Sequence, residues 1–374
     1  MKHNEALQQL LGQYFTFNSN RLTCLIHIIL GLFITQSVNL AKLSRTFSTQ
    51  TKHQSVYKRL QRFMKYLTFS HKSLFLMICD VFDIKGKLTL CMDRTNWKFG
   101  KAHINYLVVS IAYKGISIPV IWSLLTDKKC GNSDFEDRRK LFDRILTFIQ
   151  PNQIRALLCD REFLSGDWIA YLKSHKIPFV IRAKETILAS NSQGKAISFK
   201  TMFANLSNGK SSCLKASRNV LGCDVYICAK RLDSGELLIL VSNQSGRTVF
   251  DLYRIRWEIE TLFAAMKQKG FNWEDTHMTH PPRLSNLLFV LTIAFVWAYR
   301  QGDILLKDQP RKLKKHGYPQ YSIVRIGVDF IIKAISEIII DPRKILDSIR
   351  MVFKPKALKA TLNDSGGVLK CEWI

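Results

Sequence analysis

The chain has 374 residues, 47% of them hydrophobic and 23% charged, so it can bury a substantial core and is not expected to be disordered. Lys and Arg number 56 against 29 Asp and Glu, giving a formal charge of +27 that favours a polyanionic partner such as nucleic acid. The longest apolar stretches, residues 24–35 and 287–299, are shorter than the roughly 20 residues of a membrane-spanning helix, so we expect no membrane partner.

The nine cysteines are scattered without a CxxC pair, and Cys91 and Cys159 lie in apolar, strand-like runs. The first ten residues are polar and show no signal peptide. These features are typical of a cytoplasmic protein with reduced, mostly buried thiols rather than of a disulfide framework or a zinc site.

Residues 1–80 are predicted to form a helical, basic domain. No Asp or Glu occurs between Glu5 and Asp80, whereas nine Lys or Arg do. Helices are expected over residues 22–33, 39–47 and 53–66, with a polar break at residues 48–51, an arrangement that resembles a helix-turn-helix DNA reader. The candidate DNA contacts are Lys42, Arg45, Lys58, Arg59 and Arg62. The alternative is a helical domain whose basic face is merely solvated.

Residues 85–183 change to strand periodicity. Strands are predicted over residues 88–92, 106–113 and 116–125, followed by a helix that contains Phe135 to Phe148. A strand at residues 154–159, a helix near 163–175 and a strand at 177–182 complete an α/β domain with a mixed sheet.

Three further segments follow. Residues 184–247 are rich in Ser, Asn, Gly and Lys, with strands predicted at 225–229 and 237–242, and are interpreted as a β-rich insertion. Helices return over residues 248–300, and residues 301–374 form a helical C-terminal region.

Two aspartates follow matching apolar strands. Asp93 follows residues 88–92 and Asp160 follows residues 154–159, and an Arg comes directly after each. Acidic side chains that converge at strand ends can share a divalent metal ion. The alternative is that both aspartates are ordinary turn formers.

The segment DLYRIRWEIETLFAAMKQKG, residues 251–270, is predicted to be one helix that ends at Gly270. At about 100° per residue, Tyr253, Arg256, Glu260 and Lys267 share one narrow stripe beside the apolar face, while Glu258 points away. Glu260 is then within reach of Asp93 and Asp160. The alternative is a surface stripe in which Arg256 and Glu260 form an ordinary ion pair.

The spacing Tyr253-x2-Arg256-x3-Glu260-x6-Lys267 resembles the YREK signature of one family of bacterial insertion-sequence transposases of the DDE type. Asp93 in MDRTNW and Asp160 in CDREFLSGDW are similar to its first and second aspartates. The resemblance extends over most of the chain, and residues 301–374 contribute least to it.

The resemblance implies an RNase H-like catalytic core formed by residues 85–183 and 248–300, interrupted by the insertion. It implies that Asp93, Asp160 and Glu260 hold two Mg²⁺ ions, with Mn²⁺ able to substitute, for DNA cleavage and strand transfer. Arg256, Lys267 and Tyr253 would contact phosphates, and Trp257 would either contact DNA or pack. The expected partners are double-stranded transposon ends and target DNA, bound by a homodimer in a bacterial, nucleoid-associated setting.

Some features depart from the resemblance or point elsewhere. Family members often carry a Trp where Leu237 stands, and the insertion has none, so either Tyr226 serves or the hairpin step differs. His277 and His280 have metal-like spacing but no third ligand nearby, and we interpret them as loop residues. Residues 289–299 are interpreted as a core helix behind the active site.

Two alternatives to a transposase remain open. An RNase H-like nuclease without strand transfer would need the same three carboxylates. A catalytically silent DNA-binding derivative would not need them, so the intact set of acids argues against it. A fragment of about residues 1–80 is expected to retain salt-sensitive DNA binding.

Overall fold

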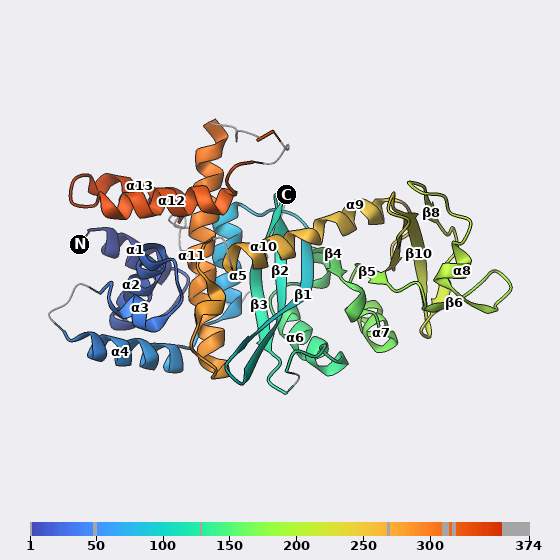
Figure 1. Cartoon of the computed structure of the whole chain (residues 1–374), viewed down its shortest axis with the longest axis horizontal. Coiled ribbons are helices and arrows are strands. Elements are labelled where there is room, and N and C mark those ends of the chain that lie inside the picture. Colours follow the sequence, from blue (N-terminus) through green and yellow to red (C-terminus); the bar gives the residue numbers. More distant parts are fainter. Residues whose placement is uncertain are drawn as a thin grey trace, which may run out of the picture. The chain divides into compact units, whose positions relative to one another are not determined.

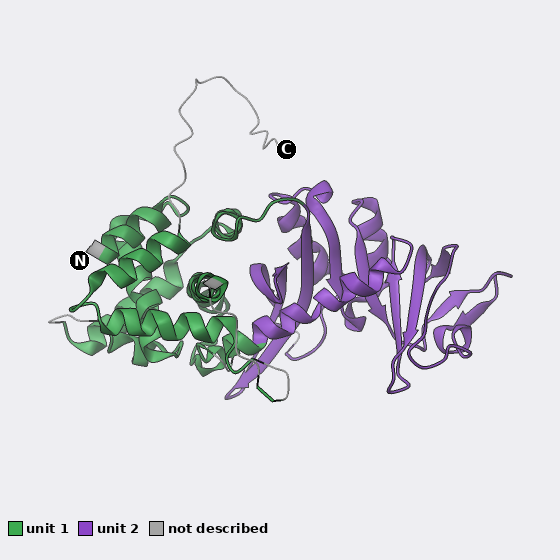
Figure 2. Cartoon of the chain, turned by 90° about the horizontal axis from the view of Figure 1, so that it is seen from above, with its two compact units in different colours: residues 1–86, 264–374 green, residues 87–263 purple. Residues whose placement is uncertain are grey.

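The computed structural model describes residues 2–47, 51–127, 129–267, 270–308, 314–315 and 319–353. The chain divides into two compact units, shown in green and purple in Figure 2. The helical unit comprises residues 1–86 and 264–374, and the catalytic unit, so called for the site described below, comprises residues 87–263.

The helical unit begins with five helices (Figure 1), of which the second, third and fourth correspond to the predicted ones and the first and fifth were not predicted. They are α1 (Lys2–Gly12), α2 (Ser19–Thr35), α3 (Leu40–Ser44), α4 (His53–Tyr66) and α5 (His71–Phe82). α4 buries Val56, Leu60, Phe63 and Met64 on one face, as its periodicity predicts. Most of the predicted polar break, residues 48–50, lies outside the described residues.

The core of the helical unit is built around α11 (Pro281–Asp308), which contacts α2, α4, α5, α12 (Ile323–Ser336) and α13 (Pro342–Val352). A short turn, η3 (Trp273–Asp275), precedes α11. By length and composition α11 is apolar enough to cross a membrane, but 83% of its apolar window is buried inside the protein. The prediction that residues 289–299 form a core helix is therefore confirmed for the helical unit.

Close packing of α11 on α12 depends on small residues. A Cβ atom on Gly327 would lie 1.8 Å from the carbonyl oxygen of Ala298, and one on Gly302 would lie 2.1 Å from that of Ile323. Both glycines therefore allow the two helix backbones to approach more closely than any side chain would permit.

The N-terminal helices pack on α11 as well as on one another. Asn286 of α11 donates hydrogen bonds to the carbonyl oxygens of Met64 and Leu67, at 2.8 and 2.9 Å, and so completes the C-terminal end of α4. A fragment of residues 1–80 would lose these bonds and the apolar surface of α11. The expectation that such a fragment retains DNA binding stays a prediction, and the fragment would have to fold without a segment more than 200 residues away.

The catalytic unit contains one mixed sheet. Its strands are β1 (Leu88–Phe99), β2 (Ala102–Tyr113), β3 (Ile116–Leu124), β4 (Ile154–Cys159), β5 (Phe179–Ala183), β6 (Leu188–Ser190), β7 (Ala196–Ser198), β8 (Ser211–Cys213), β9 (Arg218–Val220), β10 (Cys223–Arg231) and β11 (Leu237–Ser242). The order is β3-β2-β1-β4-β5-β11-β10-β9-β6-β7, with β8 paired to β10.

The first five strands form the mixed part of the sheet. β1, β2 and β3 are antiparallel neighbours, whereas β1, β4 and β5 run parallel. The β2–β3 turn, Lys114–Gly115, has φ angles of 48° and 88°, which suits a tight hairpin turn. The mixed α/β core expected from the sequence is confirmed.

Helices and short turns connect these strands. They are α6 (Phe135–Leu146), η1 (Pro151–Gln153), η2 (Arg161–Phe163), α7 (Gly166–Ser174), α8 (Phe199–Met202), α9 (Thr248–Ile255) and α10 (Trp257–Lys267). α6 packs on β3 and α7, and α9 packs on β4, β5 and β11. α9 is therefore held against the parallel strands that follow the meander.

The β-rich insertion, residues 184–247, continues the same sheet. β11 pairs antiparallel with β5, and β10 pairs with β11. Leu237, which stands where family members often carry a Trp, is the buried first residue of β11.

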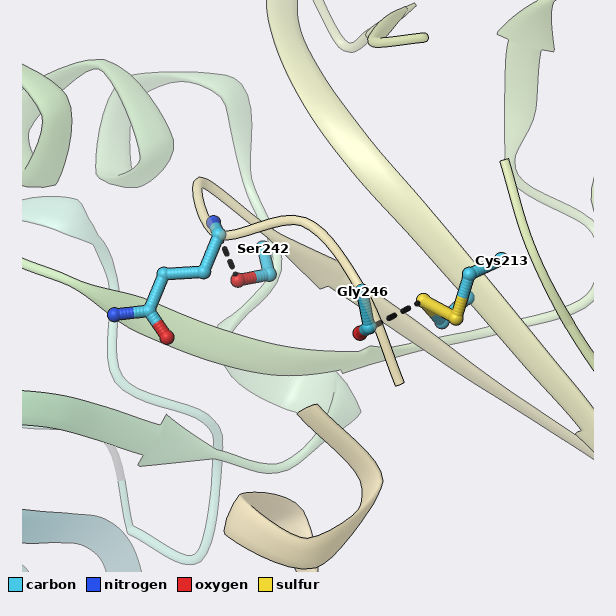
Figure 3. The surroundings of a disulfide bond; sticks show 5 residues. Cys213, Ser242 and Gly246 are labelled. Atoms are coloured by element: carbon cyan, nitrogen blue, oxygen red, sulfur yellow. Dashed lines mark hydrogen bonds between the residues drawn. A yellow bond between two sulfur atoms is a disulfide. The ribbon is translucent and has the colours of Figure 1, made fainter. Parts of the chain in front are cut away.

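The insertion also contains a disulfide, between Cys213 of β8 and Cys228 of β10, which face each other across the strand pair. Figure 3 shows this bond beside Gly246, whose carbonyl oxygen lies 3.5 Å from Cys228 Sγ, and the nearby Ser242, whose hydroxyl accepts the N–H of Gln244 at 2.9 Å. The expectation of reduced cysteines throughout is thus corrected for this pair, because the β8–β10 register places the two thiols opposite each other.

The compact units divide the predicted segment 248–300 after Phe263. Residues 248–263 belong to the catalytic unit, whereas α11 is the core of the helical unit. The predicted N-terminal domain and C-terminal region, residues 1–80 and 301–374, consequently belong to one unit.

Candidate active site

Two neighbouring parallel strands bring Asp93 and Asp160 together. Met92 and Cys159 are the last residues that β1 and β4 pair with each other, and each aspartate is the next residue along the chain. Adjacent strands lie about 4.8 Å apart, so the two side chains start from neighbouring positions at the carboxyl end of β4. The prediction that Asp93 ends its strand is wrong, because β1 continues to Phe99 while paired with β2.

The carboxylate of Asp93 is largely enclosed, with 18% of its side chain exposed. Burial raises the pKa of Asp93 to about 7, although a hydrogen bond from the Arg94 N–H, 2.7 Å from Oδ1, and the Arg256 guanidinium favour its charged form. A carboxyl group that resists ionisation in this way gains from a cation close by.

The third element is a pair of helices rather than the single helix predicted for residues 251–270. α9 ends at Ile255 and α10 begins at Trp257, with Arg256 in the break. The N–H of Arg256 donates to Tyr253 O at 3.0 Å, and the N–H of Ile259 donates to Arg256 O at 3.1 Å. These bonds span three residues instead of four, so the turn is tighter than an α-helical turn.

Tyr253 connects this element to the second aspartate. Its hydroxyl donates a hydrogen bond to Asp160 Oδ1 at 3.3 Å. Burial raises the pKa of Tyr253 well above its usual value, so the hydroxyl keeps its proton. Tyr253 is therefore placed to orient Asp160, and its ring centroid lies 5.6 Å from the Arg256 guanidinium carbon.

Arg256 connects the first aspartate to the glutamate. Its Nη1 lies 3.4 Å from Asp93 Oδ2, and its Nη2 donates to Glu260 Oε1 at 2.5 Å. The Arg256 side chain is only 8% exposed, whereas that of Glu260 is 36% exposed. Asp93, Asp160 and Glu260 thus all approach the α9–α10 break, as the stripe of the sequence predicts.

Glu258 lies elsewhere, as predicted, but it is not a solvated residue. Its Oε1 accepts the N–H of Gly115 at 2.9 Å, in the β2–β3 turn. Burial raises the pKa of Glu258. The two glutamates, only two residues apart, therefore have different surroundings.

The donors of this site suit a divalent cation, because carboxylate oxygens are the preferred ligands of Mg²⁺. As the side chains stand, no three His, Cys, Asp or Glu residues in the described ranges are close enough to hold a metal ion together. At this site the three carboxylates do not form such a group because Arg256 lies between Asp93 and Glu260. A bound ion would need the guanidinium to move.

A hydrogen-bond network around Arg94 and Arg138 lies beside the two aspartates, and it was not predicted from the sequence. Arg94 Nε and Nη2 donate to the two oxygens of Glu162 at 2.7 and 2.9 Å, and Nη1 donates to Gly131 O at 2.8 Å. Arg138, which is buried, donates to Ser133 O at 2.6 Å and to Phe163 O at 3.1 Å.

This network ties the segments after Asp93 and Asp160 to the loop before α6. The sequence feature that could have indicated this network is the Arg that directly follows each aspartate. Of these two arginines, Arg94 takes part in the hydrogen bonds described above.

Comparison with known proteins decides the family. The family model described as "Transposase DDE domain" matches residues 84–297, more than half of the chain. The chain belongs to the DDE transposase family. It is therefore a transposase, an enzyme of DNA cleavage and strand transfer, and such domains use divalent metal ions.

No curated protein sequence matches the transposase. Among solved structures it is similar to that described as "Cryo-EM structure of piggyBac transposase synaptic complex with hairpin DNA", with a TM-score of 0.47 and 11% identity, over 98% of this chain and 85% of that one.

The remaining site predictions of the transposase concern residues outside the carboxylate cluster. Trp257 is 65% exposed, so it packs little against its own chain, and its contact with DNA stays a prediction. Lys267 forms an ion pair with Glu274 at 2.7 Å, and Lys42 forms one with Asp275 at 2.8 Å. Both lysines are thus partly neutralised.

The basic face of α4 is exposed. Lys58, Arg59 and Arg62 all lie on it, and Arg45 is exposed after α3. Arg59 lies 5.1 Å from the ring centroid of Phe47.

An open cavity of about 310 Å³ lies between α2 and α4, and its lining includes Arg21, Arg59, Arg62, Phe63 and Tyr66. Arg21 and Tyr66 were not among the predicted DNA contacts.

His277 and His280 lie in the exposed loop before α11, as predicted. Asp275 Oδ1 is 3.6 Å from His277 Nε2. They belong to no group of three metal-ligating side chains among the described residues.

Proposed function

We propose that this transposase belongs to the YREK-signature family and cuts and pastes a bacterial insertion sequence, acting on its terminal inverted repeats. The observation that carries the proposal is the placement of Tyr253, Arg256 and Glu260 against Asp93 and Asp160 inside the DDE domain. In this proposal the transposase acts in the cytoplasm, on nucleoid DNA, as a homodimer that holds two transposon ends and the target DNA together.

Asp93, Asp160 and Glu260 would hold two Mg²⁺ ions, which supply activation of the attacking water or 3′-hydroxyl and stabilisation of the leaving oxygen. Mn²⁺ would substitute. The protein's own contribution is positioning: Tyr253 orients Asp160 through its hydroxyl, and Arg256 offers a guanidinium to the phosphate of the reacting strand. The exposed Trp257 would contact the bases or sugars beside that phosphate.

The helical unit would hold the DNA. Arg45, Lys58, Arg59 and Arg62 are exposed, and Arg21 adds a further guanidinium at the cavity between α2 and α4. A row of exposed cations on one helix face matches the phosphate backbone of a duplex. Lys42 and Lys267 would reach phosphates by exchanging their present acidic partners for DNA.

The test of the reaction uses the full chain and a duplex that contains the inverted repeats flanking its gene. With Mg²⁺, wild-type protein should cleave at the repeat ends and join them to a second DNA, while Asp160→Asn should do neither. Cleavage without joining would indicate the nuclease alternative. Specific binding with no cleavage in Mg²⁺ or Mn²⁺ would indicate a silent derivative.

The test of the DNA interface compares Arg62→Ala with Lys72→Ala. Lys72 is an exposed cation on α5, in the same unit but outside the α4 face. Arg62→Ala should weaken binding uniformly across sequences and lower the salt slope by about one, as loss of one phosphate contact does. Equal binding by both variants would refute the α4 interface without affecting the catalytic assignment.

A further inference from the structure

Arg256 occupies the position between two of the three carboxylates that the proposed function assigns to metal. One guanidinium bridges Asp93, at 3.4 Å, and Glu260, at 2.5 Å, from a side chain that is 8% exposed. In such an enclosed site one positive charge offsets much of the repulsion between the acids. A divalent ion on the same oxygens would do the same work, so arginine and metal compete.

The guanidinium is also incompletely bonded. Its Nε is buried and has no hydrogen-bond partner among the described residues. A buried donor without an acceptor is destabilising, and Nη1 makes only a long contact with Asp93. The Arg256 guanidinium therefore has N–H donors that lack a close acceptor. A phosphodiester would supply two anionic oxygens in the planar geometry that guanidinium prefers.

The position of Arg256 in the chain fits a change of partner. It is the single residue between α9 and α10, where the backbone bonds already span three residues instead of four. Tyr253, which holds Asp160, lies on α9, and Glu260 lies on α10. Movement of the Arg256 side chain therefore leaves both helices, and the residues that they position, in place.

From these observations we infer that Arg256 is an internal counter-ion that holds Asp93 and Glu260 until DNA phosphate draws it away, so that DNA binding strengthens divalent-cation binding. The inference rests on the proposed function, because it takes the three carboxylates as the metal site. By thermodynamic linkage the effect is reciprocal: divalent cations must strengthen DNA binding by the same factor. An enzyme built this way assembles its metal site mainly on its substrate.

The experiment measures Mn²⁺ binding to the full chain without DNA, from the loss of the free-ion electron paramagnetic resonance signal. Arg256→Gln should bind Mn²⁺ about 10-fold more tightly than wild type, within the usual range of coupling between sites. Arg256→Lys should fall between the two, since a compact ammonium cannot bridge both acids. Arg254→Gln, an exposed arginine two residues earlier, is the matched control and should equal wild type.

The second measurement tests reciprocity by fluorescence anisotropy on the inverted-repeat duplex, with Ca²⁺ as the divalent cation. Ca²⁺ should raise the DNA affinity of wild type about 10-fold and that of Arg256→Gln much less. If Arg256→Gln does not fold, Arg256→Lys replaces it in both measurements. Mn²⁺ affinity that is unchanged or weaker in the Arg256 variants would overturn the inference.

A Glu260→Gln variant separates this failure from failure of the proposed function. Loss of a true ligand should weaken Mn²⁺ binding at least about 10-fold. If Glu260→Gln binds Mn²⁺ like wild type, the metal site itself is misassigned. If Glu260→Gln weakens binding but Arg256→Gln does not tighten it, the metal site stands and only the counter-ion role is overturned.

Discussion

Asp93 and Asp160 each follow one member of the same cross-strand pair, Met92 and Cys159, so the two carboxylates begin one step beyond the end of a parallel pairing. The strand pair, rather than a loop, sets their separation. Rigid elements of this kind hold acidic groups together although they repel each other.

The first prediction concerns metal removal. Asp93→Asn and Asp160→Asn should each reduce cleavage at least about 100-fold, the scale of losing one electrostatic contribution to a transition state. Inverted-repeat binding, measured by anisotropy, should persist because the DNA-holding cations lie in the helical unit. Excess EDTA should stop wild-type cleavage, and added Mg²⁺ should restore it. Cleavage that persists in EDTA would exclude the assignment.

The second prediction compares the two glutamates of α10. Glu260→Gln should abolish strand cleavage, because an amide is a poor ligand for Mg²⁺. Glu258→Gln should keep most activity, since the glutamine carbonyl oxygen can still accept the Gly115 N–H. Cleavage at matched Mg²⁺ concentration is the measurement. Equal activity of the two variants would mean that the catalytic glutamate is misplaced.

The third prediction concerns the buried ion pair of Arg94 and Glu162, whose side chains are 9% and 21% exposed. Arg94→Met leaves Glu162 unpaired and should lower the free energy of unfolding by about 3 kcal/mol. The matched control is Arg139→Met, which breaks an exposed pair with Glu136 and should leave stability almost unchanged. Urea unfolding of both variants measures these changes. Similarly small losses in the free energy of unfolding would show that the Arg94 network adds little stability.

The fourth prediction concerns His27 of α2. Burial lowers its pKa below 6.5, and nearby Arg59 lowers it further. The unfolded chain therefore takes up the proton first as the pH falls, so this contribution to stability is full above pH 6.5 and is lost below it. Urea unfolding at pH values on both sides of 6.5 should show an acid-induced loss that His27→Gln reduces. If the free energy of unfolding of His27→Gln depends on pH as steeply as that of wild type, the role of His27 is contradicted.

Much of this architecture could be predicted from the sequence, because it depends on local periodicity. The bounds of α4, β4 and β11 coincide with the predicted ones. The stripe of Tyr253, Arg256 and Glu260 also predicted that Glu260 lies beside Arg256, since side chains three and four residues apart share a helix face.

What could not be predicted depends on contacts between distant segments. β1 continues beyond Asp93 because β2 pairs with it, and the break at Arg256 accompanies ion pairs with residues on both sides of the site. The Cys213–Cys228 bond follows from strand register, which nine scattered cysteines do not reveal. The compact units depend on α11 meeting helices more than 200 residues earlier.

The pairing of β11 with β5 has a consequence for attempts to shorten the protein. Removing residues 184–247 would leave the backbone N–H and C=O groups of β5 without the partners that β11 now supplies. Exposed strand edges of this kind recruit other chains and promote aggregation. A minimal catalytic domain would therefore need to keep β11, or a designed strand in its place, to remain in solution.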